Sequence, residues 1–276
     1  MAADPADPAD AADATGLSGL SGLWHHAPKL PLLPWLLWQG RRVRAQALRL
    51  PEAAGERQGR IEPSRWDDTA QGIPLSLLII GDSSAAGVGV GDQSEALAGC
   101  LAAALSAETG LPVRWQLLAT SGHTAADALD AFKALPAVAL QPAQLLVTAL
   151  GVNDAVAQRS PATWLATLDA LTALAGARAG VRQTWHCGLP DVGAFPLLPQ
   201  PLRWVLGRDA RRLDAALQAH LAGRQDRRHV PLPALPAGQE AVASGWMAVD
   251  GFHPGPAGYR AWGQGLAAEI ARGLRA

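Results

Sequence analysis

The sequence predicts an α/β fold in which helices cover both faces of a parallel β-sheet. From residue 75 onwards, short apolar runs alternate with longer segments that have helical patterns. The runs at 75–80 and 145–150 each stop at a glycine, which is typical of buried parallel strands. Strands that alternate with helices of this length form βαβ units. The chain has 276 residues, of which 49% are apolar, and this is ample for the core of such a domain.

Each element has its own local signal. Strands are expected at 75–80, 113–119, 145–150, 181–187 and, more briefly, 229–232. An Ala/Leu-rich helix at 96–108 stops before Gly110, and Thr124 is a suitable N-cap for a helix at 124–135. Ser160 as cap and Pro161 at the first helical position open a helix that runs to about residue 179. An Arg/Leu-patterned helix at 207–221 and a closing helix at 256–274 complete the series.

The N-terminal part has a different composition. Residues 1–28 begin with an Ala/Asp/Pro repeat and are expected to be a disordered, low-complexity tail. Residues 29–70 are expected to form an N-terminal arm, and residues 71–276 a single α/β domain. The arm contains the apolar segment 30–38, which is followed by arginines. This apolar segment is far too short to span a bilayer. Either this segment makes a peripheral membrane contact or it packs as an arm against the domain.

Composition excludes several classes of function. The net charge is −1 and basic residues form no long run, which argues against nucleic-acid binding and favours a small-molecule substrate. Cys100 and Cys187 lack the C-x-x-C spacing of a zinc ribbon, and the histidines are scattered. We therefore expect no metal site. The acidic N-terminus lacks the basic start of a signal peptide, so a cytoplasmic location with membrane association left open is expected.

A glycine-rich segment after the first strand could suggest a nucleotide site. A dinucleotide-binding loop needs the pattern G-x-G-x-x-G, whereas the glycines here, at 87, 89 and 91, follow G-x-G-x-G. A phosphate loop would need a lysine before Ser or Thr, and this segment has none. The small residues are expected instead to let this loop and the following helix pass close to Ser83.

The chemistry-bearing residues follow the strands. In doubly wound sheets, ligands bind beyond the carboxyl ends of the strands. The predicted strand ends and the turn before the last helix supply Ser83, Gly122, Asn153, Asp250 and His253. A serine is a weak nucleophile until an imidazole takes its proton, and a carboxylate can hold that imidazole in the correct tautomer. Ser83, His253 and Asp250 fit these three roles. The N–H groups of Ser83 and Gly122 and the amide of Asn153 could stabilise an oxyanion.

These segments resemble the SGNH hydrolases, also called GDSL-type lipases and esterases. Gly-Asp-Ser83 matches the first block of that family, Gly122 the second, Gly-Val-Asn153-Asp the third, and Asp250-x-x-His253-Pro the last. The resemblance covers about residues 75–275. It implies a flavodoxin-like, three-layer α/β/α fold and esterase, lipase or thioesterase activity without a cofactor. Ser84 departs from the family's usual leucine, at a position that carries no named catalytic role.

Alternatives remain open for individual features. Ser83 could cap a helix, Gly122 could be an ordinary turn glycine, and Asn153 or Asp250 could be turn formers. The apolar, proline-rich segment 192–206 could line an acyl pocket or simply shield the sheet. At the level of function, the alternatives are an O-deacetylase for carbohydrate or peptidoglycan and a non-catalytic binding module on the same scaffold.

Overall fold

The structure is a computed structural model that describes residues 32–63, 73–236 and 238–275. The chain divides into two units, Met1–Ala45 and Gln46–Ala276. The described part of the first unit is helical and belongs to α2 (Leu33–Gln46). No helix in the described ranges is both long and apolar enough to cross a bilayer. The predicted disordered tail, 1–28, lies outside the described residues.

The second unit is built on a six-stranded sheet with the order β1-β3-β2-β4-β5-β6. Its strands are β1 (Gln58–Ile61), β2 (Leu75–Gly81), β3 (Val113–Ala119), β4 (Leu145–Ala149), β5 (Gln183–Cys187) and β6 (Arg227–Val230). Strands β2 to β6 are parallel, and β1 pairs antiparallel with β3 at one edge. All residues of β2 and β4 are buried, because helices cover both faces of these central strands.

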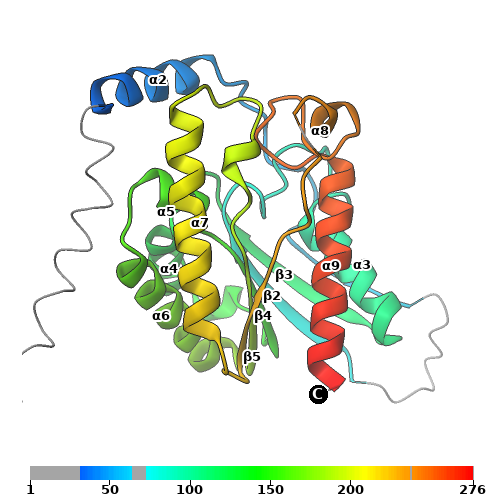
Figure 1. The fold of residues 1–276 in the computed structure, drawn as a ribbon. Coiled ribbons are helices and arrows are strands. Elements are labelled where there is room, and N and C mark those ends of the chain that lie inside the picture. Colours follow the sequence, from blue (N-terminus) through cyan, green and yellow to red (C-terminus); the bar gives the residue numbers. More distant parts are fainter. Residues whose placement is uncertain (1–31, 64–72, 237, 276) are drawn as a thin grey trace, which may run out of the picture. The chain divides into compact units, whose positions relative to one another are not determined.

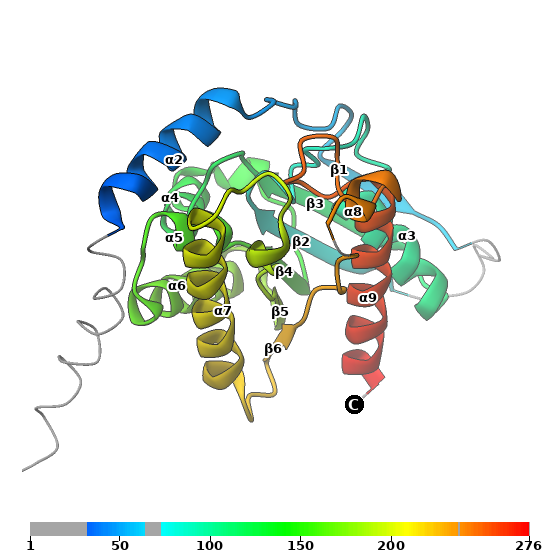
Figure 2. The ribbon, with the colours of Figure 1, turned by 45° about the horizontal axis from the view of Figure 1, so that its top comes forward.

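Helices form a layer on each face of the sheet (Figure 1). One layer contains α3 (Leu97–Thr109) and α9 (Pro256–Arg275), which pack against each other. The other contains α4 (Ala125–Ala134), α5 (Val152–Val156), α6 (Pro161–Ala179) and α7 (Leu202–Leu221), and Figure 2 shows the sheet between the two layers. The short helices η2 (Ala137–Ala139), η3 (Val192–Ala194) and α8 (Glu240–Ala243) lie in the connections. The predicted α/β, three-layer fold is confirmed.

Local sequence explains where several helices begin and end. The Thr124 hydroxyl accepts from the Asp127 N–H while the Asp127 side chain accepts from Thr124, which forms a capping box at the start of α4. Ser160 caps α6, and Pro161 occupies its first turn as predicted. Gly110 and Gly180 end α3 and α6 in the left-handed conformation.

Three element predictions need correction. The residues 58–61, assigned to the N-terminal arm, form an edge strand of the sheet. Its half-exposed pattern has no apolar run that could have indicated a buried strand. Helix α7 begins at Leu202 rather than 207, directly after Pro201, whose fixed φ suits a helix start. Strand β6 ends at Val230 rather than 232, because Pro231 has no N–H for the ladder.

Candidate active site

Ser83 lies in the tight turn that follows β2. The turn begins at Gly81, where an added Cβ would lie 2.3 Å from the Ala85 Cβ and 2.9 Å from the Ala149 carbonyl oxygen. Only glycine allows this close approach, which brings the chain back over the end of the sheet. The turn holds Ser83 at the carboxyl edge of the central strands, next to the neighbouring strand β4.

His253 and Asp250 lie in the loop that precedes α9, and they form a continuous hydrogen-bonded chain with Ser83. The Nε2 atom of His253 is 2.9 Å from Ser83 Oγ, and its Nδ1 atom is 2.6 Å from Asp250 Oδ2. An ionised carboxylate can only accept, so Nδ1 carries the proton and Nε2 of the neutral ring accepts from the serine hydroxyl. The predicted nucleophile, base and orienting acid are thus in contact, although 170 residues separate Ser83 from His253.

The environment of Asp250 favours its ionised form. Burial opposes ionisation, but hydrogen bonds from the His253 ring and from the N–H groups of His253 and Phe252 outweigh it. The net effect lowers the pKa of Asp250 below its usual value. Its side chain is 3% exposed. A charged, shielded carboxylate of this kind fixes both the tautomer and the orientation of the histidine.

Asn153 comes from the first turn of α5, after Gly151 (φ +138°) at the end of β4. Its amide nitrogen donates to the His123 carbonyl oxygen at 2.9 Å and to Asp82 Oδ2 at 3.3 Å. An amide nitrogen has two hydrogens, so it would donate to an oxyanion by giving up one of these bonds. The bond to Asp82 is the longer and therefore the weaker one. The Ser83 N–H has no hydrogen-bond acceptor among the described residues.

Gly122 lies in the turn after β3, one residue before His123, and has a φ of +85°. Through His123 this turn contacts the Asn153 amide. Gly122 itself is exposed and is not one of the described residues that line the cavity beside Ser83. Its role as an oxyanion donor stays a prediction.

Asp82 is a buried carboxylate that the sequence analysis did not single out. Its Oδ1 atom accepts from the Ser84 N–H at 3.0 Å and from the Ser84 hydroxyl at 2.6 Å, and its Oδ2 atom accepts from Asn153. Asp92 makes the same two bonds to Ser94 but is solvent-exposed. The bonds from Ser94 lower the pKa of Asp92. Burial raises the pKa of Asp82, although its bonds from Ser84 act in the opposite direction. The Asp-x-Ser spacing was visible in the sequence, but the burial was not.

Asp154, which follows Asn153, joins α5 to the start of α4. Its Oδ2 atom accepts from the Ala125 N–H at 2.9 Å, at the first residue of α4. Burial raises the pKa of Asp154 to about 6, although this hydrogen bond and Arg159 act in the opposite direction. Asp154 therefore holds the loop that carries Asn153 and is separate from the Ser83–His253–Asp250 chain.

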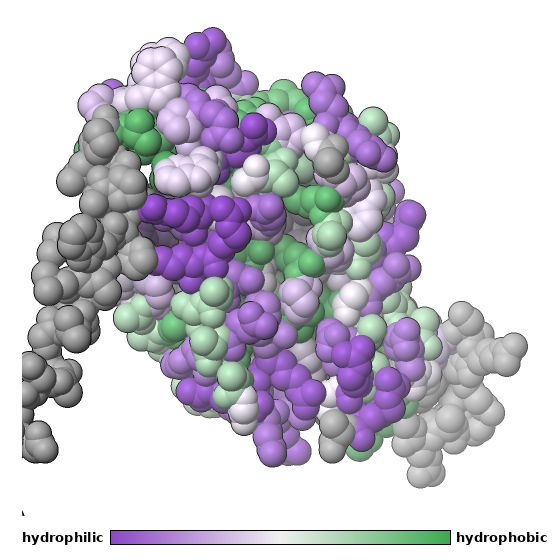
Figure 3. Space-filling view, viewed as in Figure 1, coloured by the Kyte–Doolittle hydropathy of each residue, from purple (hydrophilic) through white to green (hydrophobic). Residues whose placement is uncertain are grey.

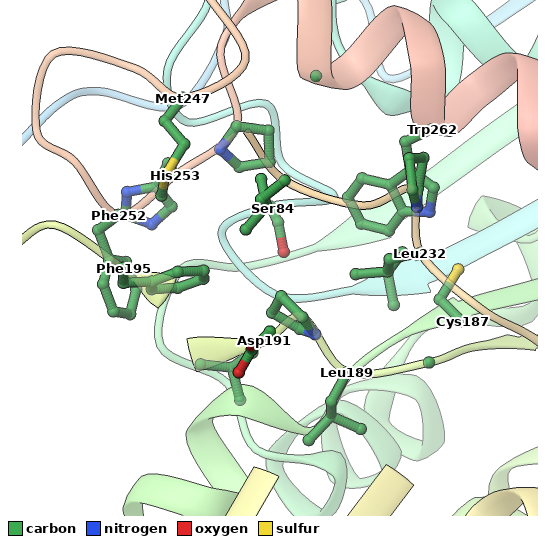
Figure 4. Close-up of a pocket in the computed structure, with 18 of the residues that line it drawn as sticks. Ser84, Cys187, Leu189, Asp191, Phe195, Leu232, Met247, Phe252, His253 and Trp262 are labelled. Carbon is green, nitrogen blue, oxygen red and sulfur yellow. The ribbon is translucent and has the colours of Figure 1, made fainter. Parts of the chain in front are cut away.

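A cavity of about 410 Å³ opens beside Ser83, Asn153 and His253. Figure 4 shows Ser84 in the middle of the view, with His253, Phe252 and Phe195 on one side and Trp262, Leu232 and Cys187 on the other. Most of the walls are apolar, and the large apolar side chains are Leu150, Leu189, Phe195, Leu232, Leu235, Trp246, Met247, Phe252 and Trp262. The size is within the range of about 300–1,000 Å³ that is usual for small-molecule sites.

Two polar pairs also line or border the cavity. The Arg211 guanidinium lies 3.0 Å from Asp191, and His229 Nε2 lies 2.8 Å from Asp214. Asp214 Oδ1 also accepts from the Leu189 N–H, which ties α7 to the loop after β5. The sequence analysis did not find these residues, because no local pattern marks pairs that a long helix forms with distant loops and strands.

The segment 192–206, predicted either to line an acyl pocket or to shield the sheet, borders the cavity at one residue. Phe195 lines the cavity and packs edge-on against Phe252, with 5.2 Å between ring centroids. Val192, Leu198 and Val205 are instead buried in the protein. The segment therefore lines the cavity with Phe195 and packs several of its other apolar side chains into the protein interior.

Neither cysteine has the character of a nucleophile. Both are free thiols, and burial raises the pKa of Cys187 to about 12 and also raises that of Cys100. Cys187 therefore contributes only a small apolar surface to the cavity. In the described part of the chain, no three His, Cys, Asp or Glu side chains cluster as metal ligands would.

The structure is a three-layer α/β/α fold in which separate loops bring the Ser83, His253 and Asp250 side chains together at one edge of the sheet. The chain belongs to the GDSL-like lipase/acylhydrolase family, whose model matches residues 79–261. The predicted resemblance to the SGNH, or GDSL-type, hydrolases is thereby confirmed. A search of curated proteins gave no match to this chain.

Solved structures share the fold. The structure of TesA is 25% identical, with a TM-score of 0.53 over 72% of this chain and 100% of that chain. The lipase Lip_vut3 from a goat rumen metagenome is 16% identical, with a TM-score of 0.57 over 70% of this chain and 96% of that chain. Est24, a carbohydrate acetylesterase from Sinorhizobium meliloti, is 18% identical, with a TM-score of 0.51 over 72% of this chain and 99% of that chain.

Proposed function

We propose that this protein hydrolyses carboxylic esters or thioesters of apolar acyl chains through a covalent acyl-enzyme. The observation that supports this most is the chain of hydrogen bonds from Asp250 through His253 to Ser83, at 2.6 and 2.9 Å, beside an apolar cavity. A serine, an imidazole and a carboxylate in this order are the parts that acyl transfer requires.

In the proposed mechanism, Ser83 Oγ attacks the acyl carbon while His253 Nε2 takes the hydroxyl proton. Asp250 stabilises the imidazolium that forms. The tetrahedral oxyanion receives hydrogen bonds from the Ser83 and Gly122 N–H groups and from the Asn153 amide. His253 then passes its proton to the departing alcohol or thiol. A water molecule repeats the sequence on the acyl-enzyme, with His253 as base, and releases the carboxylic acid and the free Ser83 hydroxyl.

The cavity supports an acyl chain longer than acetyl. Its walls are formed largely by aliphatic and aromatic side chains, and about 410 Å³ is more space than an acetyl group fills. Burial of each further methylene in such a cavity strengthens binding by about 0.8 kcal/mol. An O-deacetylase acting on carbohydrate or peptidoglycan would use the same residues on a polar substrate. The apolar lining favours instead an ester with a longer, apolar acyl chain.

The test is turnover of chromogenic esters that differ in acyl length, with acetylated sugars assayed in parallel. We expect kcat/KM to rise from acetyl to medium-length acyl esters, and we expect the Ser83→Ala variant to lose turnover by at least about 1,000-fold. A preference for acetylated sugars would support the deacetylase instead. Turnover that Ser83→Ala leaves unchanged would refute the proposed mechanism, and a folded protein without any turnover would point to a binding module.

A further inference from the structure

Helix α2 carries large apolar side chains that face solvent. Leu33, Trp35, Leu37 and Trp38 are 46%, 53%, 54% and 48% exposed. All four belong to the first two turns of the helix. Exposed apolar residues that occur singly are ordinary, but four within six residues form a cluster of the kind that marks an interaction site.

The same segment is strongly basic. Arg41, Arg42 and Arg44 are exposed in the second half of α2, and Arg49 follows shortly afterwards. The sequence contains no acidic residue between Asp13 and Glu52. The net charge of the whole chain is only −1, so this positive charge is local. A partner for this surface must therefore combine negative charge with an apolar layer.

The two tryptophans connect the apolar and basic parts of the helix. The rings of Trp35 and Trp38 lie 5.0 Å apart, and the Arg42 guanidinium lies over the Trp38 ring at 5.3 Å. Indole rings favour the boundary between hydrocarbon and polar headgroups, where arginine can reach lipid phosphates. The space-filling view shows hydrophobic and strongly hydrophilic surface close together on α2 (Figure 3).

We propose that α2 binds to the surface of an anionic lipid bilayer, with the leucines and tryptophans at the acyl boundary and the arginines at the headgroups. The helix has 14 residues, which suits an interfacial position and is too short for a span. A second copy of α2 would bring like charges together. A nucleic acid would satisfy the arginines but leave Leu33 and Leu37 in water. The proposal is independent of the ester-hydrolase function, which is measured on a soluble substrate.

The test is co-sedimentation of the full-length protein with vesicles of phosphatidylcholine alone or mixed with phosphatidylglycerol. We expect binding to the mixed vesicles that weakens with added salt. Each arginine near an anionic surface strengthens binding roughly fivefold, so Arg41→Gln/Arg44→Gln should weaken it on the order of 25-fold. Trp35→Ser/Trp38→Ser should weaken it roughly tenfold or more, because it removes most of the apolar contact.

Trp204 offers a matched control on α7. It is 45% exposed, and the Arg208 guanidinium lies over its ring at 5.3 Å, but it is not part of the α2 cluster. We expect Trp204→Ser to bind vesicles like the unchanged protein. Equal sedimentation with both vesicle types, or equal losses for Trp204→Ser and Trp35→Ser/Trp38→Ser, would overturn the proposal. Retention on duplex DNA without vesicle binding would overturn it in favour of a nucleic-acid partner.

Discussion

Asp82 accepts three hydrogen bonds at the point where the nucleophile turn meets the Asn153 loop. Two come from Ser84 and one from the Asn153 amide. All three partners are donors, so the site suits a carboxylate and has no place for a donor on Asp82. Through these bonds Asp82 fixes the residue that follows the nucleophile and, before an oxyanion forms, orients the Asn153 amide proposed to stabilise it.

The Asp82→Asn variant should therefore lower kcat. Its –NH₂ group must face either Ser84 or Asn153, and one of these donors then loses its acceptor. We expect kcat on a soluble ester to fall roughly tenfold to a hundredfold with little change in KM, since removing a complete oxyanion donor costs about 100- to 1,000-fold.

Asp92→Asn is the matched control for this substitution. Asp92 makes the same pair of bonds to Ser94 at an exposed position. It should leave both kcat and KM unchanged, while thermal unfolding checks that both variants are folded. If kcat were the same in Asp82→Asn and Asp92→Asn, the assigned positioning role of Asp82 would be wrong.

The sequence was sufficient to predict that Ser83, Asp250 and His253 lie together, because their positions follow from a simple rule. Each lies beyond a strand end or before the last helix, and parallel strands bring such segments to one edge of the sheet. The role of Asp82 depends on its burial and on a bond to a residue 71 positions away, which no local pattern encodes. Ser84 departs from the family pattern, and its hydroxyl is one of the donors to Asp82.

At the scale of elements, the packing of α9 against α3 closes one face of the sheet. A Cβ added at Gly263 of α9 would lie 2.8 Å from the carbonyl carbon of Cys100 and from the Leu101 N in α3. These are backbone atoms, which cannot move aside without shifting the helix. At Gly265, two residues further along α9, an added Cβ would meet nothing within 4 Å.

The Gly263→Ala and Gly265→Ala variants should have opposite effects on stability. Each substitution stabilises the helix by up to about 1 kcal/mol through helix propensity. Gly263→Ala also overpacks the contact between α9 and α3, which lowers the stability of the fold by roughly 1–3 kcal/mol, or more where backbone must shift. We expect a lower Tm for Gly263→Ala and an unchanged or higher Tm for Gly265→Ala, measured by thermal unfolding. Equal Tm values for the two variants would contradict the close α3–α9 packing.

Burial also decides which elements could be predicted. The strands β2 and β4 are fully buried and therefore appear as continuous apolar runs. Strand β1 is a four-residue edge strand with alternating exposure, and its sequence is not distinguishable from a loop. The early start of α7 did leave a signal, because a proline directly precedes Leu202.

At the scale of the molecule, the cavity is a product of the whole second unit. Its lining comes from the ends of the central strands, from the loops after β5 and β6, from α7 and from the segments around α9. The order of strands in the sheet, which the sequence pattern did not specify, decides which of these loops meet. For this reason the contact among Ser83, His253 and Asp250 could be predicted, whereas the shape of the cavity and the Arg211–Asp191 and His229–Asp214 pairs could not.

Covalent labelling tests most directly whether Ser83 is the nucleophile. The folded protein would be treated with a fluorophosphonate, and the modified peptide would be identified by mass spectrometry. We predict a single adduct on Ser83 that is absent in Ser83→Ala and forms far more slowly in His253→Ala, because the imidazole takes the hydroxyl proton. An adduct on a different serine, or an esterase-active preparation that never labels at Ser83, would contradict the account.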